Sequence, residues 1–169
     1  LPSEEPQARE GSLAIYSAQK ADSANFSAAL RQFCSEIEAR DYVALLAYIE
    51  ETTETYQALQ LIRKEIRDAT RCATTVGYGP RFLHSTGQLH KGGPDSGVFL
   101  QLTASDAINF PIPNEPFTMG TLKDAQALGD FQSLQAHGRR AIRIDLGADV
   151  LSGLEQLREA LKTVLSSDE

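Results

Sequence analysis

Side chains able to do chemistry gather in one glycine-rich stretch, GYGPRFLHSTGQLHKGGPDSG, which runs from Gly77 to Gly97. The stretch holds half of the 12 glycines of the chain and two of its three histidines. Glycine lets a backbone approach a ligand closely, and the ordinary pKa of histidine suits proton transfer near neutral pH. The polar side chains of the stretch predict a loop that binds an anionic, hydroxylated small molecule; they are His84, Ser85, Thr86, Gln88, His90 and Lys91.

His84 is the main candidate for a reactive group, because it lies between the rigid pair Gly79-Pro80 and the flexible sequence Ser85-Thr86-Gly87. Its imidazole could act as a general acid or base, could bond a sugar hydroxyl, or could only hold the loop in place. Lys91 could likewise meet a phosphate or a carboxylate, or could simply be solvated. The residue types alone leave these alternatives open.

Several common kinds of site are excluded by the pattern. The P-loop sequence GxxxxGK[ST] is absent, and Gly77 and Gly79 lack the third glycine of the dinucleotide fingerprint. Two histidines without clustered Asp, Glu or Cys make a poor metal site. There is no Gly-x-Ser-x-Gly nucleophile elbow, and no cysteine neighbours a histidine. The pattern therefore does not indicate a metal site, and hydrolase chemistry has no support.

Charge and composition limit the kinds of molecule that the protein could bind. The net charge of −7 argues against nucleic acid, since phosphate binding needs an excess of Lys and Arg. The longest apolar runs, such as Tyr42–Ile49, are too short to cross a bilayer. Cys34 and Cys72 have no CxxC spacing and are typical of buried free thiols in a reducing compartment. The sequence therefore predicts a cytoplasmic protein with neither nucleic-acid nor membrane partners.

Apolar runs alternate with helical patterns along the chain. We expect strands at Ser12–Tyr16, Tyr42–Ile49, Thr74–Val76, Val98–Thr103 and Ala141–Leu146. We expect helices at Ser27–Glu38, Glu54–Arg71, Phe117–His137 and Ala148–Leu165. This alternation predicts an α/β fold, a three-layer sandwich around a mainly parallel five-stranded sheet. The polar residues 1–11 are expected to be a linker or disordered end, and residues 12–169 a single lobe.

The expected topology also gives a place for a site. In such folds ligands bind beyond the carboxyl ends of the strands, near the point where the strand order reverses. The glycine-rich stretch begins at the carboxyl end of the third expected strand, and the pair Glu50-Glu51 follows the second. Any of five carboxylates that precede the stretch could supply a base; they are Glu50, Glu51, Glu54, Glu65 and Asp68. His137, beside Gly138, is interpreted as a partner of a helix C-terminus.

The chain also resembles a known family. The stretch ATTVGYGPRFLHSTGQLHKGGPDSGVFLQL, Ala73–Leu102, is similar to the carboxyl-terminal region of phosphoglucose isomerases fused behind transaldolase. Three further segments resemble the same proteins: DYVALLAYIE, PFTMGTLKDAQALGDF and HGRRAIRIDLGADV. The resemblance runs from about Leu13 to the end and implies the second sugar-isomerase (SIS) lobe, a Rossmann-like parallel sheet flanked by helices. It implies interconversion of glucose 6-phosphate and fructose 6-phosphate without cofactor or metal.

The resemblance also implies roles for residues. A histidine opens the sugar ring in these isomerases, and a glutamate moves a proton between C1 and C2 through an enediol. By the order of HSTGQLHKGG, the resemblance assigns ring opening to His84, with His90 as the alternative. It places the substrate against the rest of the segment, that is Ser85, Thr86, Gln88, His90, Lys91 and Gly92.

The chain departs from the family at two motifs. Where the family has Glu-Ser-Asn-Gly-Lys, this chain has RDATRCATT, so Glu65 and Asp68 are the nearest candidates for the base. The family's late lysine has no counterpart in GADVLSGLEQLREAL.

The family's pocket lies between two lobes, and nothing here resembles the first lobe or a transaldolase barrel. The expected partners are therefore a sugar phosphate and those missing domains, with a homodimer left open. We expect the lobe to be nearly inactive alone. The alternative is a non-catalytic module that binds a sugar phosphate or docks on another protein.

Overall fold

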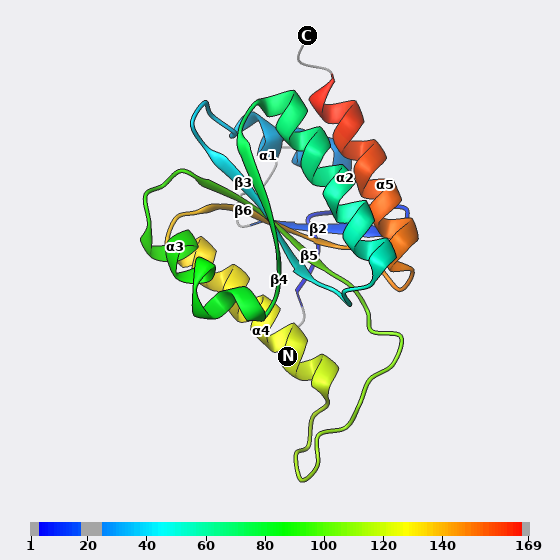
Figure 1. The fold of residues 1–169 in the computed structure, drawn as a ribbon. Coiled ribbons are helices and arrows are strands. Elements are labelled where there is room, and N and C mark those ends of the chain that lie inside the picture. The colour runs from blue at the N-terminus through cyan, green and yellow to red at the C-terminus, as the bar shows by residue number, and fades with distance from the viewer. Residues whose placement is uncertain (1–3, 18–24, 167–169) are drawn as a thin grey trace.

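The structure, a computed structural model, describes residues 4–17 and 25–166 and is an α/β fold (Figure 1). The strands of the described part are β1 Ala8–Glu10, β2 Leu13–Ser17, β3 Tyr42–Tyr48, β4 Ala73–Tyr78, β5 Gly97–Thr103 and β6 Arg140–Asp145. The helices are α1 Phe26–Ser35, α2 Thr53–Thr70, α3 Thr86–Gly92, α4 Met119–Ala136 and α5 Val150–Leu165, with a short 3-10 helix, η1, at Arg81–His84.

The strands form one mixed sheet of six strands in the order β1-β2-β6-β5-β3-β4. Strands β3, β4, β5 and β6 are parallel, while β2 is antiparallel to both of its neighbours. The predicted sheet of five mainly parallel strands is therefore corrected to six. The extra strand, β1, lies within residues 1–11, where a linker or disordered end was expected, and pairs Ala8 with Ile15. Its three residues, ARE, are too few to show an alternating pattern.

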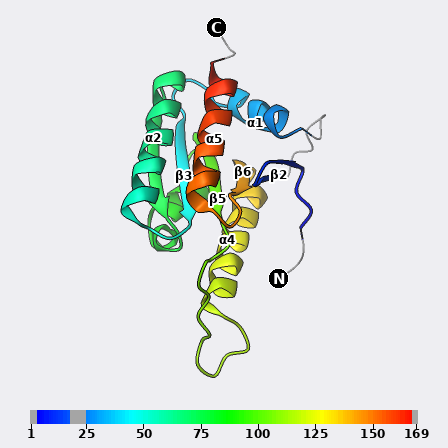
Figure 2. The same ribbon diagram turned by 90° about the vertical axis from the view of Figure 1, so that its right-hand side faces the viewer.

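The strand order explains which face each connection covers. The chain steps from β3 outward to β4, then returns past β3 to β5 and continues to β6. Crossovers between parallel strands are right-handed, so steps in opposite directions along the sheet put their helices on opposite faces. Accordingly α2 packs with α1 and α5 on one face, while α3 and α4 lie on the other (Figures 1 and 2).

Two apolar cores lie on the two sides of the sheet. Leu45, Leu100 and Ile144 point to the core under α1, α2 and α5. Leu46 and Phe99 point the other way, toward the core under η1 and α4. Side chains alternate between the faces of a strand, so a strand covered on both faces must be apolar throughout. The run YVALLAY of β3 meets this requirement.

Polar residues set the helix ends close to where the sequence predicts them. The side chains of Asn25, Thr52, Thr118 and Asp149 accept backbone N–H bonds at the starts of α1, α2, α4 and α5. The main difference is within the glycine-rich stretch, expected to be a flexible loop, which contains η1 and α3. In the described part of the chain, no helix has the length and apolarity needed to span a membrane.

Candidate functional site

The glycine-rich stretch leaves β4 at its carboxyl end and folds back over the face of the sheet that α4 covers. The ring of Phe82 in η1 packs edge-on against Tyr48 of β3, with 5.6 Å between the ring centres. A Cβ atom at Gly79 would lie 2.5 Å from the Tyr48 ring, so only glycine allows the chain to pass this point. Gly79 thus fixes where the stretch turns back over the sheet.

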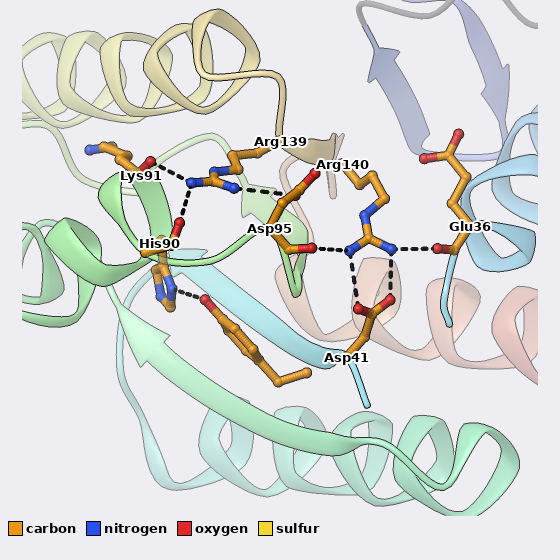
Figure 3. Close-up of polar contacts among 9 residues, drawn as sticks. Glu36, Asp41, His90, Lys91, Asp95, Arg139 and Arg140 are labelled. Carbon is orange, nitrogen blue, oxygen red and sulfur yellow. Dashed lines mark hydrogen bonds and ion pairs between the residues drawn. The ribbon is translucent and has the colours of Figure 1, made fainter. Parts of the chain in front are cut away.

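His90 is part of the core beneath α3. His90 is 3 % exposed, and the centre of its ring lies 4.8 Å from the ring centre of Phe99 and 5.7 Å from that of Tyr42. A hydrogen bond of 2.9 Å joins His90 Nδ1 to Tyr42 Oη (Figure 3). Burial lowers the pKa of His90 below 6.5, a shift that the Asp130 charge opposes and the Lys91 charge assists. The imidazole is therefore neutral at pH 7 and holds α3 against the sheet.

Lys91 forms an ion pair inside the protein. Its ammonium lies 2.6 Å from Asp130 Oδ1 of α4, and the Lys91 and Asp130 side chains are 21 % and 2 % exposed. Asp130 Oδ2 also accepts a hydrogen bond of 3.2 Å from Tyr48 Oη, which is buried. Burial, assisted by the Asp130 carboxylate, raises the pKa of Tyr48 far above its ordinary value. The three groups hold α3, α4 and β3 together.

Arg139, just before β6, holds the end of α3, and the neighbouring Arg140 binds other parts of the chain (Figure 3). Arg139 Nη2 donates to the carbonyl oxygens of Lys91 at 2.7 Å and Gly93 at 2.6 Å. The neighbouring Arg140 binds both carboxylate oxygens of Asp41, at 2.6 and 3.1 Å. The Arg139 bonds satisfy carbonyls that a helix end leaves without intrahelical partners. The stretch is therefore fixed at its carboxyl-terminal end.

Most of the other predicted binding residues face solvent. His84, Ser85 and Thr86 lie at the junction of η1 and α3 and are exposed, and so are Gln88 and Gly92 on α3. Within residues 4–17 and 25–166, no hydrogen bond or ion pair reaches the His84 side chain. We call His84, Ser85, Thr86 and Gln88 the exposed polar group. The structure thus places them on one turn, apart from the buried His90 and the half-buried Lys91.

Glu65 and Asp68 are not brought together with His84. Both belong to α2, which covers the opposite face of the sheet from η1 and α3. Glu65 Oε1 accepts bonds of 2.8 and 2.7 Å from Arg158 of α5, and Asp68 pairs with the adjacent Arg67 at the surface. With the sheet between them, neither carboxylate can act together with His84 on one small molecule. Glu51, in contrast, contacts the segment that carries His84, because it forms an ion pair with Arg81 of η1.

A separate hollow opens at the carboxyl edge of the sheet, where the strand order reverses between β3 and β5. Its volume is about 580 Å³, and its polar wall includes Glu50, Ser105, Asp106 and Lys123. Lys123 Nζ donates to Asp106 Oδ1 at 2.6 Å and to the carbonyl of Ala104 at 3.1 Å. Such a wall offers one cation and several acceptors to a hydroxylated ligand.

The other wall of this hollow is apolar and open. It includes Ile108, Phe110 and Met119, which are 70, 63 and 56 % exposed. The sequence pattern pointed to Glu50 at this edge but not to Lys123 or Asp106. The signal was available: the proline-rich connection after the fourth expected strand starts at the same edge, and Lys123 lies in the first turns of the helix that follows.

The remaining expectations concern metals, thiols and His137. No group of three His, Cys, Asp or Glu side chains within the described ranges could hold a metal ion. Cys34 and Cys72 are free thiols, the second buried and the first partly buried. His137 ends α4, and its Nδ1 lies 2.7 Å from the carbonyl oxygen of Ser133. The interpretation of His137 as a partner of the helix C-terminus is confirmed.

Comparison with known proteins shows the fold and no more. No protein-family model matches the chain, and no curated protein matches it significantly. Among solved structures, the hypothetical protein TT0462 from Thermus thermophilus is similar, with a TM-score of 0.71 and 12 % sequence identity. The match covers 83 % of this chain and 38 % of that one. The chain thus spans well under half the length of this solved protein.

Proposed function

We propose that this chain is one lobe of an aldose–ketose isomerase that interconverts glucose 6-phosphate and fructose 6-phosphate. The observation that carries the proposal is that the exposed polar group lies on a turn whose other side is bound to the sheet. His90, Lys91 and Arg139 fix α3 to the sheet, while the side chains of the exposed polar group face outward. A fixed turn that presents an imidazole, hydroxyls and an amide is suited to a sugar. The resemblance of this segment to the isomerases specifies the sugar phosphate.

The chemistry assigned to this chain is ring opening. The His84 imidazole, acting as acid and base, would move a proton from the C1 hydroxyl to the ring oxygen as the C1–O bond breaks. The Ser85 and Thr86 hydroxyls and the Gln88 amide would hold sugar hydroxyls. A carboxylate would then take the proton from C2 of the open aldose and return it to C1 through the enediol, while a proton passes from the C2 hydroxyl to the C1 oxygen. Glu51 or a residue of a completing lobe is the carboxylate we assign to this step, because Glu65 and Asp68, the candidates nearest to the family's motif, lie beyond the sheet.

A completing lobe is supported by the open hollow at the carboxyl edge. Ile108, Phe110 and Met119 are large apolar side chains that solvent reaches, and contiguous exposed apolar surface is characteristic of interaction sites. The resemblance places such a lobe, with the phosphate-binding loops, in the same protein. The chain alone is therefore expected to bind fructose 6-phosphate weakly and to have almost no isomerase activity.

The test compares His84→Ala with His137→Ala, a control that removes another exposed histidine far along the sequence. Isomerase activity is followed by coupled assay in a protein that joins this chain to the completing lobe. His84→Ala should reduce kcat by about 10²-fold or more, the usual contribution of a general acid or base, while His137→Ala should not. Equal activity in both variants would refute the assignment. Robust isomerisation by the isolated chain would refute the proposal that a second lobe is needed to complete the site.

A non-catalytic sugar-phosphate sensor is the second candidate, because Glu51 pairs with Arg81 of η1 and, within the described residues, no carboxylate bonds to His84. Calorimetric titration with fructose 6-phosphate separates the two. Binding by the joined protein that His84→Ala abolishes, without turnover, selects the sensor. Turnover that Glu51→Gln lowers selects the isomerase with Glu51 as its base.

A further inference from the structure

A buried arginine that does not line the hollow described above lies in a small cavity on the α4 side of the sheet, and this cavity shares Ser105 with that hollow. Arg143 of β6 is 8 % exposed, and its guanidinium carbon lies 4.1 Å from the centre of the Tyr16 ring. The ring of Phe131 of α4 is also near, with its centre 5.4 Å from the same carbon. Two aromatic rings therefore fix the guanidinium, and its cation–π contacts keep its charge in place away from water.

The counter-ion of this arginine comes from the terminal segment. Glu4 Oε2 lies 2.5 Å from Arg143 Nη2, and the Glu4 side chain is 34 % exposed. Glu4 lies outside any helix or strand, three residues before Gln7, whose N–H extends the β1–β2 pairing. A buried charge needs a partner, and within the described residues Glu4 is the carboxylate that pairs with Arg143. The partner is thus carried by an irregular segment instead of the sheet.

The cavity beside the ion pair has a volume of about 220 Å³ and is lined in part by Ser105, Asp124 and Asp145. Asp145 accepts bonds from Thr103 Oγ1 at 3.0 Å and from the N–H of Gly147 at 2.9 Å, which hold its carboxylate in place. Burial raises the pKa of Asp124, an effect that Lys123, 3.6 Å away, opposes and that the carboxylates of Asp106 and Asp145 assist. The cavity therefore joins one cation to a wall of acceptors.

We propose that Arg143 is the centre of a binding site for a small hydroxy- or amino-monocarboxylate, and that Glu4 occupies this site until the ligand displaces it. The ligand carboxylate would replace that of Glu4 on the guanidinium, which binds carboxylates through two parallel N–H bonds. Its hydroxyl or ammonium group would donate to the acceptors at Asp145, Asp124 and Ser105. A phosphate dianion would meet repulsion from the two aspartates. The volume limits the ligand to a few heavy atoms, since drug-sized ligands need about 300 Å³ or more.

Glu4→Gln tests the proposal because it removes the competing charge on an irregular segment and leaves the cavity intact. The control is Glu5→Gln, the same change at the next residue, which is exposed. Glycolate and glycine are titrated into each protein by calorimetry, together with acetate, which lacks the adjacent donor, and inorganic phosphate. We expect Glu4→Gln to bind glycolate or glycine at least tenfold more tightly than the wild type and the Glu5→Gln control do. Acetate and phosphate should bind less well.

A second variant keeps the test decisive. In Glu4→Gln/Arg143→Gln, glycolate should give no heat of binding and no rise in melting temperature, with folding checked by circular dichroism. If that variant does not fold, two-dimensional NMR of Glu4→Gln must show glycolate-induced shifts at Tyr16 and Arg143. Equal affinity in the wild type and Glu4→Gln would overturn the proposal. So would absence of glycolate and glycine binding to Glu4→Gln, or preference for phosphate.

Discussion

Replacing Asp130 by leucine should destabilise the protein strongly, because this carboxylate has two partners in the interior. It receives the Lys91 ammonium at 2.6 Å and the Tyr48 hydroxyl at 3.2 Å, and its side chain is 2 % exposed. Asp130→Leu would leave a cation and a buried hydroxyl without their acceptor. Both orphaned groups lie under the turn that carries the exposed polar group.

The magnitude follows from burial. Removing one partner of a buried ion pair costs about 3–5 kcal/mol, and a buried hydroxyl without a partner costs about 1–3 kcal/mol. Lys91 is 21 % exposed, so its ammonium can reach water and the lower end applies. The two costs share one acceptor and do not add, so we expect the free energy of unfolding to fall by about 3 kcal/mol. With a urea slope of about 2 kcal/mol/M, the midpoint falls by about 1.5 M.

Urea unfolding followed by circular dichroism measures this change. The control is Asp95→Leu, the same substitution at a carboxylate that is 62 % exposed and lies 3.2 Å from Arg139, and it should cost less than about 1 kcal/mol. The double variant Asp130→Leu/Lys91→Met should recover much of the loss, because an apolar replacement of both partners is often neutral. A loss below about 1 kcal/mol for Asp130→Leu, or no recovery in the double variant, would refute this reasoning.

Two further predictions concern the same segment. The pKa of His90 is lowered below 6.5 in the folded state, so its contribution to stability is complete above pH 6.5 and is lost as the pH falls from there through the folded-state pKa. The urea midpoint of the wild type should therefore fall more between pH 7 and pH 5 than that of His90→Phe, and parallel pH profiles would contradict the prediction. Gly79→Ala should cost about 1–3 kcal/mol, because its Cβ would lie 2.5 Å from the buried Tyr48 ring. Gly92→Ala, whose Cβ meets nothing within 4 Å, is the matched control, and thermal unfolding that shows equal losses would contradict the packing argument.

Much of the fold could be predicted because its central strands are buried on both faces. Runs such as YVALLAY and GVFLQLT have few polar residues, so their positions as β3 and β5 stand out. Strand β1 could not be predicted, because its three residues ARE contain one buried side chain. Helix α3 was also missed, since it is seven residues long and contains Gly87 and Gly92, which are poor helix formers. Its stability comes from tertiary contacts of His90 and Lys91.

The sequence was enough to predict the edge of the sheet at which the candidate site lies, but not the face of the sheet on which each candidate residue lies. The rule that ligands bind beyond the carboxyl ends of parallel strands pointed to Glu50 and to the start of the glycine-rich stretch, and the structure places Glu50 beside the hollow at that edge. Knowledge of the strand order was needed to judge whether Glu65 or Asp68 could lie near His84. Once β3 is known to lie between β4 and β5, the right-handed crossovers put α2 and η1 on opposite faces. Sequence distance gave no sign of this separation.

The polar residues of the glycine-rich stretch have two different roles, depending on whether they face the protein interior or the solvent. The buried side chains of His90, Asp130 and Tyr48, with the half-buried Lys91, are no more stabilising than a well-packed apolar core would be, since desolvation offsets much of each interaction. Directional bonds nevertheless define one position for α3, whereas apolar contacts tolerate several. Because the exposed polar group begins at the start of α3, that single position determines where the His84 imidazole is presented. The residues that resemble ligand-binding groups in sequence thus divide into those that fix the turn and those available to a ligand.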